Sequence, residues 1–398
     1  MKMDLEIFER KLHSLTVFHT LMEQPLFKKL VQCLQSRNES EFIERYSALC
    51  SYIYSLQGNL SRAVYEQVMN DENFYVMKKG AKEPVSFCME ASVQRELGIL
   101  QEVLDLKSTD LKTMFDTGIE LADWDNEPFD LAAEYARRIS ELSKKGYGMF
   151  ARFHMFGLDE NGLFPIQHPD PQLLKNMTGY ERERDLLVKN TLAFLQGMKA
   201  NNALLYGDAG TGKSSTIKAI VNEYWKDGLR LVEVKKAQIR RLPALIESLG
   251  DNPLKFIIFI DDLSFTTGDD DFIAFKNILE GGSVAPNRNV IVYATSNRRH
   301  LVKESFAERD GSEIHRSDTI QETASLAARF GLTITFSKPA KDLYLDIVKS
   351  YAQQYDLELK DEELFVKAEA FALRNNGRSP RTARQFAEHQ KILETMKD

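Results

Sequence analysis

The stretch Gly207–Ser215, which reads Gly-Asp-Ala-Gly-Thr-Gly-Lys-Ser-Ser, decides the fold of this chain. It meets the pattern G-x-x-x-x-G-K-[ST] at four positions: Gly207, Gly212, Lys213 and Ser214. An apolar run, Ala203 to Tyr206, precedes the stretch, and a segment with helical spacing follows it. The sequence therefore predicts a strand, a loop and a helix in succession.

A loop of this composition suits a polyphosphate. Glycines let the backbone come close to the anion, and the start of the helix directs free N–H groups and its positive dipole end at it. We expect Lys213 to reach the β- and γ-phosphates and Ser214 to bind Mg²⁺ through its hydroxyl. The nucleotide-binding residues are then Gly207, Asp208, Ala209, Gly210, Thr211, Gly212, Lys213, Ser214 and Ser215. The alternative is a glycine-rich turn without a ligand.

Two further strand ends carry polar side chains. Phe256 to Asp262 is an apolar run that ends in two carboxylates, and Val290 to Asn297 ends in Thr-Ser-Asn. If these strands lie near the loop, we expect Asp261 to bind the magnesium through water and Asp262 to orient or deprotonate an attacking water. Asn297 is expected to hold that water or a phosphate oxygen without adding charge.

The region from residue 201 onward alternates strands and helices. Its expected strands are Ala203–Tyr206, Arg230–Val234, Phe256–Ile260, Val290–Ala294 and Leu332–Phe336, with helices at about 213–226, 237–249, 271–280 and 319–328. Continuous apolar runs indicate parallel strands covered on both faces. We predict an α/β fold with a parallel five-stranded sheet, a ligand at the carboxyl ends of the strands, and a helical lid after Pro339.

The first part of the chain predicts a different architecture. Apolar residues recur there at helical intervals, and residues 148–166 have the pattern of a hairpin, so we expect a mainly helical N-terminal domain over residues 1–165. Prolines after residue 164 then indicate a linker. The sheet domain is expected over 166–337 and the lid over 338–398.

The composition of the chain indicates the number of its domains and the environment in which it folds. The 398 residues are 43% hydrophobic, which is enough for two or three domains with buried cores. Cys33, Cys50 and Cys88 include no C-x-x-C pair, which favours a reduced, intracellular environment. The first residues lack the core of a signal peptide, and no run approaches the roughly 18 apolar residues of a membrane span. We expect a cytoplasmic protein with no membrane segment.

The distribution of charge gives only weak support for a nucleic acid partner. The net charge of −7 lies in residues 1–165, and the remainder is balanced. An acidic N-terminal part is poorly suited to follow a nucleic acid backbone. Four cations, Lys235, Lys236, Arg240 and Arg241, are the candidate phosphate contacts, and a solvated helix face explains them equally well.

The order of these motifs resembles the AAA+ ATPase superfamily. More narrowly, five segments resemble a bacterial family of predicted AAA-type ATPases of unassigned function: Gly179–Arg182, Leu204–Gly207, Asp261–Phe265, Ala294–Leu301 and Arg381–Phe386. The resemblance covers residues 166 to 398. It implies ATP and Mg²⁺ as cofactors, with Tyr180 beside the adenine. It also implies catalytic roles for Asp262 at the second acidic motif, for Asn297 as first sensor and for Arg381 as second sensor.

The resemblance further implies an assembly. Arg329, in Ala-Arg-Phe-Gly-Leu, matches the arginine that such ATPases project into a neighbouring subunit's site, so we expect a homo-oligomeric ring or spiral. Asp262 stands where many relatives carry Glu, which implies slow hydrolysis. The segment after the second strand has no pore aromatic, which disfavours polypeptide threading.

Three functions remain open on the sequence. The first is hydrolysis of ATP to ADP and phosphate that remodels an unknown client bound by the N-terminal domain. The second is a nucleotide-gated scaffold with little hydrolysis, and the third is a DNA-associated loader. A small-molecule kinase built on the same loop is disfavoured by Arg329 and Arg381.

Overall fold

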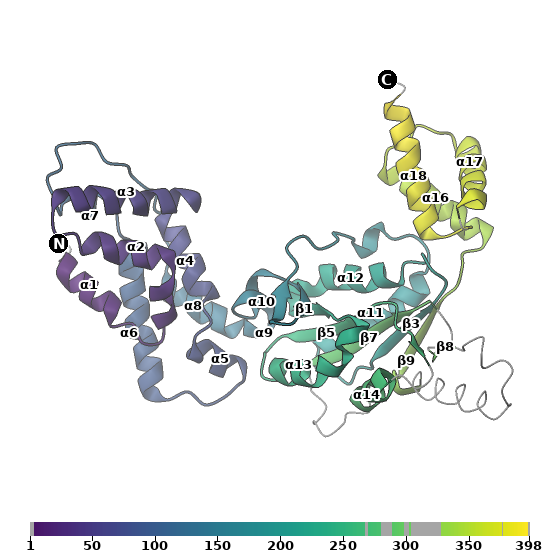
Figure 1. Ribbon diagram of the computed structural model, residues 1–398, viewed down its shortest axis with the longest axis horizontal. Helices are drawn as coiled ribbons and strands as arrows, with labels where there is room; N and C mark the ends of the chain where they lie inside the picture. The colour runs from purple at the N-terminus through teal and green to yellow at the C-terminus, as the bar shows by residue number, and fades with distance from the viewer. Residues whose placement is uncertain are drawn as a thin grey trace. The chain divides into compact units, whose positions relative to one another are not determined.

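The computed structural model describes residues 4–266, 270–279, 289–297, 302–303, 328–375 and 377–396. The chain divides into two compact units, residues 1–152 with 251–253 and residues 153–250 with 254–398. Figure 1 draws the N-terminal helices in purple and blue, the sheet in teal and green, and the C-terminal helices in yellow.

The first unit is helical, as predicted. Its main helices are α1 (Leu5–His13), α2 (Pro25–Leu34), α3 (Glu39–Ser55), α4 (Leu60–Asn70), α5 (Phe74–Gly80), α6 (Phe87–Leu104), α7 (Ser108–Lys112), α8 (Leu131–Ser140), α9 (Leu142–Lys145) and α10 (Met149–Arg152). Several begin at a side chain that accepts a hydrogen bond from the first turn. Asn38, Asn59 and Asn73 each do so at 2.9 Å, which satisfies an N–H group that the helix leaves without a partner.

One apolar cluster holds these helices together. Phe8, Phe18, Phe27, Phe42 and Tyr46 are each at most 1% exposed and belong to the same core. Because these buried side chains come from separate segments and meet in one cluster, the unit has a core independent of the sheet.

The second unit is built on a sheet of seven described strands in the order β2-β1-β4-β5-β7-β3-β9. The strands are β1 (Met155–Asp159), β2 (Gly162–Pro165), β3 (Ala203–Gly207), β4 (Leu229–Glu233), β5 (Lys255–Ile260), β7 (Val290–Ser296) and β9 (Leu332–Phe336). All neighbours are parallel except β1 and β2. The carboxyl ends of β3, β5 and β7 therefore meet at one edge.

Helices cover both faces of this sheet (Figure 1). Helices α11 (Glu181–Leu195) and α12 (Lys213–Tyr224) pack on one face, where they share a core with alternate residues of the strands. Helices α13 (Leu242–Leu249) and α14 (Asp270–Leu279) lie on the other face. Burial on both faces explains why these strands read as unbroken apolar runs.

The predicted α/β fold class is confirmed, with seven described strands where five were expected. The two additional strands are the hairpin of β1 and β2, because β1 pairs in parallel with β4 from Met155↔Leu231 to Gly157↔Glu233. The compact sheet unit accordingly begins at residue 153 rather than at 166. The segment Met149–Arg152, which reads as a strand, forms the short helix α10.

The described residues of the lid form three helices, α16 (Lys341–Gln354), α17 (Asp361–Arg374) and α18 (Pro380–Thr395). They enclose an apolar core that includes Tyr344, Ile347 and Phe386. Ser379 caps α18 by accepting the N–H of Thr382 at 3.1 Å. This cap fixes the start of the helix that carries Arg381.

The remaining described elements are short. They are the 3₁₀ turns η1 (His19–Glu23), η2 (Leu174–Asn176), η3 (Trp225–Asp227) and η4 (Lys236–Arg241), and a parallel pair of β6 (Phe265–Thr266) and β8 (Val302–Lys303). The helix expected at 319–328 falls outside the described residues except for Ala328.

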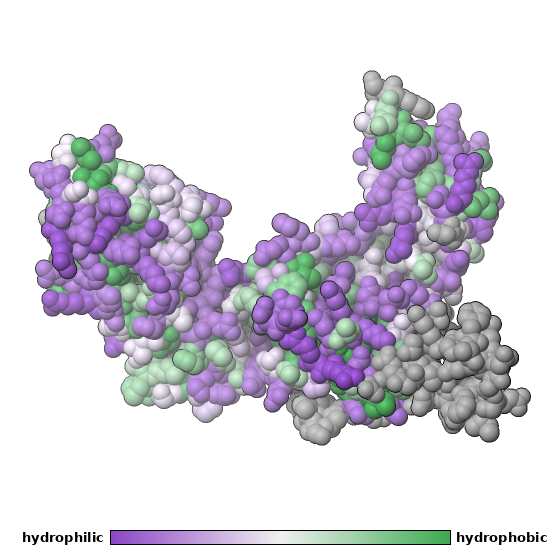
Figure 2. Space-filling model, viewed as in Figure 1, coloured by the Kyte–Doolittle hydropathy of each residue, from purple (hydrophilic) through white to green (hydrophobic). Residues whose placement is uncertain are grey.

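Apolar side chains gather inside the units. On the face shown in Figure 2, hydrophilic residues cover most of the surface, and hydrophobic ones form small patches. Among the described residues, no helix has the length and apolar character that crossing a bilayer requires.

His154 is a titratable residue packed at the edge of the sheet unit. Its Nε2 donates to Asn222 Oδ1 at 3.0 Å, since Asn222 Nδ2 already donates to the carbonyls of Asp170 and Gln172. Its ring stacks on Trp225 with centroids 5.4 Å apart. Burial lowers the pKa of His154, although the Asn222 hydrogen bond opposes this shift.

We expect the sheet unit to lose stability in mild acid through His154. Because the folded state holds this pKa below the ordinary value near 6.5, the unfolded state binds the proton more readily, so stability falls as pH drops through that value. Urea midpoints measured at pH 7.5 and 5.5 should differ more for the wild type than for His154→Gln, which keeps a donor and does not titrate. The exposed His168, changed to Gln, is the control. Equal pH dependence in wild type and His154→Gln would contradict this assignment.

Candidate functional site

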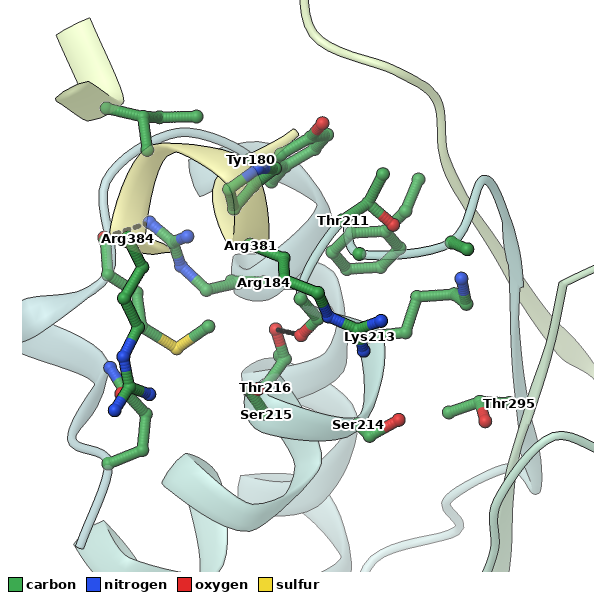
Figure 3. A pocket seen from close by; sticks show the side chains of 18 of the residues that line it. Tyr180, Arg184, Thr211, Lys213, Ser214, Ser215, Thr216, Thr295, Arg381 and Arg384 are labelled. Carbon is green, nitrogen blue, oxygen red and sulfur yellow. Dashed lines mark hydrogen bonds between the residues drawn. The ribbon is translucent and has the colours of Figure 1, made fainter. Parts of the chain in front are cut away.

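A cavity of about 380 Å³ lies between the loop after β3 and the lid. The side chains that line it come from the loop, the ends of β5 and β7, the segment before α11, and helices α16 and α18. In Figure 3, Arg381 reaches from the lid toward the N-terminal end of α12, where Lys213, Ser214 and Ser215 begin the helix. The structure thus gathers at one cavity most of the residues that the sequence analysis singled out.

Lys213 is the buried cation of this cavity, with 6% of its surface exposed. Its ammonium donates to the carbonyls of Asp208 at 2.7 Å and Gly207 at 3.0 Å, and to Asn297 Oδ1 at 3.0 Å. Burial lowers the pKa of Lys213, and the charges of Asp261, Asp208 and Asp262 raise it. Three acceptors therefore occupy the three N–H groups of the ammonium.

A second set of hydrogen bonds joins Ser214 to Asp261, the two residues expected to bind Mg²⁺. Asp261 Oδ1 accepts hydrogen bonds from the hydroxyls of Ser214 at 2.6 Å and Thr295 at 2.5 Å. In Figure 3, the Ser214 side chain points toward Thr295. A hydroxyl and a carboxylate at this spacing form the hard oxygen set that Mg²⁺ takes when phosphates supply further ligands. Among the described residues, no group of three His, Cys, Asp or Glu side chains forms a closed metal cage.

Asp262 and Asn297 form the next pair. Asn297 Nδ2 donates to Asp262 Oδ1 at 2.8 Å, while its Oδ1 accepts from Lys213. The backbone of Asp262 is left-handed, with φ 50°, and its N–H donates to Thr295 Oγ1 at 3.0 Å. The amide therefore bridges the buried cation and the second carboxylate.

Two of the predicted loop residues do not line the cavity. Gly207 and Asp208 precede the first lining residue of the loop, and the Asp208 N–H donates to the carbonyl of Phe336 at 3.0 Å. A Cβ added to Gly207, whose φ is 132°, would come within 2.1 Å of the same carbonyl oxygen. Gly207 is thus needed for the close approach of β9, and the cavity begins at Ala209.

The lid contributes Arg381 to the cavity. Its backbone N–H donates to the carbonyl of Gly210 at 3.2 Å, and its side chain lines the cavity together with Pro380 and Arg384. Arg384 is itself paired with Glu388, Nε to Oε1 at 2.8 Å. Of the two arginines, Arg381 is the one that the sequence analysis placed here.

Apolar side chains also line the cavity, and Tyr180 is one of them. This residue has a φ of 60°, its ring centroid lies 5.3 Å from that of Phe336, and its hydroxyl donates to the carbonyl of Ser337 at 2.6 Å. Burial raises the pKa of Tyr180 to about 12. Met177, Ile347 and Tyr351 line the cavity as well.

Arg184 is a cavity residue that the sequence analysis missed. It is 8% exposed, and its guanidinium donates to the carbonyls of Gly179 and, at 2.8 Å, of Met177. Burial lowers the pKa of Arg184, although Glu181, 3.2 Å away, raises it. Its position three residues before the buried Leu187 was the available signal, because an arginine on the apolar face of a helix is rarely buried without partners.

Arg329 is not brought to this cavity. It precedes β9, and β9 runs parallel to β3, whose carboxyl end leads into the loop. Arg329 therefore lies toward the amino end of the strands, at the opposite end of the sheet from the cavity. Within one chain the site forms without it.

The four cations considered for nucleic acid contacts have mostly internal partners. Lys236 Nζ lies 5.0 Å from the ring centroid of Phe265, Arg240 Nε donates to Asp271 Oδ1 at 2.7 Å, and Arg241 donates to the carbonyl of Asp159. These contacts give Lys236, Arg240 and Arg241 a structural role.

A match to a known family covers the same part of the chain. The model of a family described as "Protein of unknown function (DUF815)" matches residues 150–392. No curated protein has a significant match to the chain. The matched range runs from α10 into α18, so it includes the cavity and leaves out helices α1 to α9.

Among solved structures, a mutant of Thermotoga maritima RuvB is 17% identical with a TM-score of 0.41, covering 57% of this chain and 67% of its own. A FIGL-1 AAA domain in complex with ADP is 16% identical with a TM-score of 0.39, covering 58% and 76%. A structure titled for katanin self-assembly is 17% identical with a TM-score of 0.37, covering 57% and 73%.

A matched pair of glycine substitutions tests the close approach of β9. Gly207 and Gly162 have similar φ angles, 132° and 119°, but of these two glycines only Gly207 would bring an added Cβ within 4 Å of another atom. We expect Gly162→Ala to cost about 1–2 kcal/mol for the left-handed backbone, and Gly207→Ala to cost about 1–3 kcal/mol more for overpacking. Urea unfolding measures both, and equal costs would contradict the steric argument.

Proposed function

We propose that this chain, which belongs to the family described as Protein of unknown function (DUF815), binds ATP with Mg²⁺ in this cavity and hydrolyses it to ADP and phosphate. One observation supports the proposal above the others: five polar side chains from the start of α12 and from the ends of β5 and β7 converge there, namely Lys213, Ser214, Asp261, Asp262 and Asn297. Hydrolysis then drives a conformational change that remodels a client, which residues 1–152 select.

The phosphates belong at the N-terminus of α12. This 12-residue helix begins at Lys213 and directs its free N–H groups and positive dipole end into the cavity. Lys213 supplies the charge. Ser214 and Asp261 would hold Mg²⁺, which neutralises charge on the β- and γ-phosphates when bound.

Asp262 and Asn297 suit the attack of water. Asn297 can fix a water or a γ-phosphate oxygen between the cation and the carboxylate that it already bridges. The water oxygen forms a bond to the γ-phosphorus, the bond to the β–γ bridging oxygen breaks, and Asp262 accepts the proton. Arg381 offers positive charge from the lid, so hydrolysis and lid position are coupled.

The apolar side chains that line the cavity suit the adenine base of ATP. Met177, Tyr180, Ile347 and Tyr351 border the cavity beyond the loop, and two of these four belong to α16 of the lid. A planar ring bound there contacts both the sheet domain and the lid. Binding of the nucleotide therefore favours a closed lid.

Oligomerisation completes this proposal. Arg329 is absent from the cavity of its own chain, and a second copy in a ring or spiral would supply its Arg329 to the neighbouring γ-phosphate. No contact described above favours the DNA-loader alternative, since three of the four candidate cations have internal partners.

Substitution of Asp262 tests the chemical step. We expect Asp262→Asn to lower kcat about 10²–10⁴-fold, because a general base contributes that much, and to leave ATP affinity nearly unchanged. Lys213→Ala should instead abolish ATP binding. Phosphate release and fluorescent nucleotide titration measure the two effects. If wild type and Asp262→Asn bind ATP equally and turn it over at the same negligible rate, the chain is a nucleotide-gated scaffold.

A mixing experiment tests the shared site. Arg329→Ala should lower turnover at least about 10³-fold and preserve ATP affinity, as for other arginine fingers. Mixing Arg329→Ala with Lys213→Ala should restore part of the activity, because the Lys213→Ala copy still carries an arginine for its neighbour. Turnover unaffected by Arg329→Ala, or no recovery on mixing, would count against subunits that complete one another's sites.

A further inference from the structure

The loop after β3 is bonded to the hinge of the lid. We define the hinge as residues 337–340, between the end of β9 at Phe336 and the start of α16 at Lys341. Asp208 is hydrogen-bonded both to the last residue of β9 and to this segment. Its N–H donates to the carbonyl of Phe336 at 3.0 Å, and its Oδ2 accepts the N–H of Lys338 at 2.9 Å.

The carboxylate of Asp208 faces the hinge and not the cavity. Asp208 is absent from the cavity wall, although Ala209 to Thr216 all belong to it. A negative side chain beside a polyphosphate would repel it. An aspartate in a phosphate loop therefore needs another role, and the bond to Lys338 provides one.

The same residue is bonded to the phosphate-binding cation. The carbonyl of Asp208 accepts from Lys213 Nζ at 2.7 Å and from Thr211 Oγ1 at 2.8 Å. Because three protein acceptors already occupy the three N–H groups of Lys213, the ammonium can donate to a phosphate only by releasing at least one of them. Two of those acceptors are the peptide carbonyls on either side of the Asp208 N–H.

We propose that Asp208 is a positioning residue that transmits phosphate occupancy at Lys213 to the hinge of the lid, an inference that rests on the proposed ATPase function. A phosphate that displaces the carbonyl of Gly207 or of Asp208 from Lys213 removes a bond that fixes the loop, and the Gly207–Asp208 peptide then reorients. That peptide carries the N–H bonded to Phe336, and its residue carries the carboxylate bonded to Lys338. The hinge therefore moves with the loop.

A second contact attaches the loop to the lid. Arg381 N–H donates to the carbonyl of Gly210, three residues after Gly207, so the loop is attached to both the hinge and α18. A shift of the loop then pulls on the lid at two separate points, one before α16 and one at the start of α18. Removal of the Asp208 carboxylate should leave α18 attached and the hinge released.

The test uses the full-length chain and three variants. Asp208→Ala removes the acceptor for the Lys338 amide, and Asp208→Asn keeps an acceptor oxygen of the same reach. Asp346→Ala is the matched control, since it removes an exposed carboxylate from α16 at a site outside the cavity. Thermal unfolding first establishes that each variant folds.

Hydrogen exchange of peptides spanning residues 336–341 then reports on the hinge. Without nucleotide, we expect Asp208→Ala to speed exchange at the Lys338 amide about tenfold, with Asp208→Asn and Asp346→Ala close to wild type. ATP with Mg²⁺ should change this exchange in the wild type and not in Asp208→Ala. In turnover, Asp208→Ala should lower kcat about tenfold and change ATP affinity less than about threefold.

The possible failures are distinguishable. If the wild type binds no ATP, the proposed function falls and this inference falls with it. If the wild type hydrolyses ATP and Asp208→Ala matches it in hinge exchange, the proposed function stands and only the coupling role of Asp208 is overturned. Equal losses in affinity and kcat, without recovery in Asp208→Asn, would assign Asp208 to the structure of the loop alone.

Discussion

The absence of a side chain at Gly207 is the constraint on which the site depends. With a Cβ 2.1 Å from the carbonyl oxygen of Phe336, β9 could not pair with β3 up to the last residue of the strand. That pairing brings the end of β9, and with it the hinge of the lid, against the first turn of the loop. The cavity therefore depends on the close contact between the backbones of β3 and β9, which the missing side chain of Gly207 permits.

Charge balance in the cavity follows from the burial of Lys213. Taking an ammonium out of water is costly, and it is tolerated here because two carbonyls, an amide oxygen and three nearby carboxylates compensate it. A phosphate that enters the cavity must displace at least one of the protein acceptors that already bind Lys213. Binding is thus linked to rearrangement of the loop.

Much of this fold could be predicted from local sequence. The run Leu332–Phe336 forms β9 with the expected bounds, and the loop follows a strand and opens a helix as its pattern requires. The pairing of β1 with β4 could not be predicted, because it joins residues 76 apart in the chain, Met155 and Leu231, and depends on the edge that the sheet leaves open. Local pattern says nothing about such an edge.

The site was predictable where its chemistry resides in side chains that follow a motif, as with Ser214 and Asp261. It was not predictable where a side chain acts on backbone. Arg184 donates to the carbonyls of Met177 and Gly179, and Asp208 accepts the backbone N–H of Lys338. The three partner groups belong to the backbone, so the residue types at positions 177, 179 and 338 do not reveal these contacts. Such contacts appear only once the chain has folded.

Backbone strain marks the same cavity independently of its motifs. Five non-glycine residues have positive φ in the part of the chain that the structure describes, and two of them, Tyr180 and Asp262, line the cavity. Glycine would adopt either conformation at less cost, so the side chains must be needed there. Around Tyr180, Arg184 and Glu181 bond the residues on its N-terminal side, and around Asp262, Thr295 and Asn297 hold its amide and carboxylate. The neighbours that fix these two conformations are therefore part of the site as much as the residues that face its ligand.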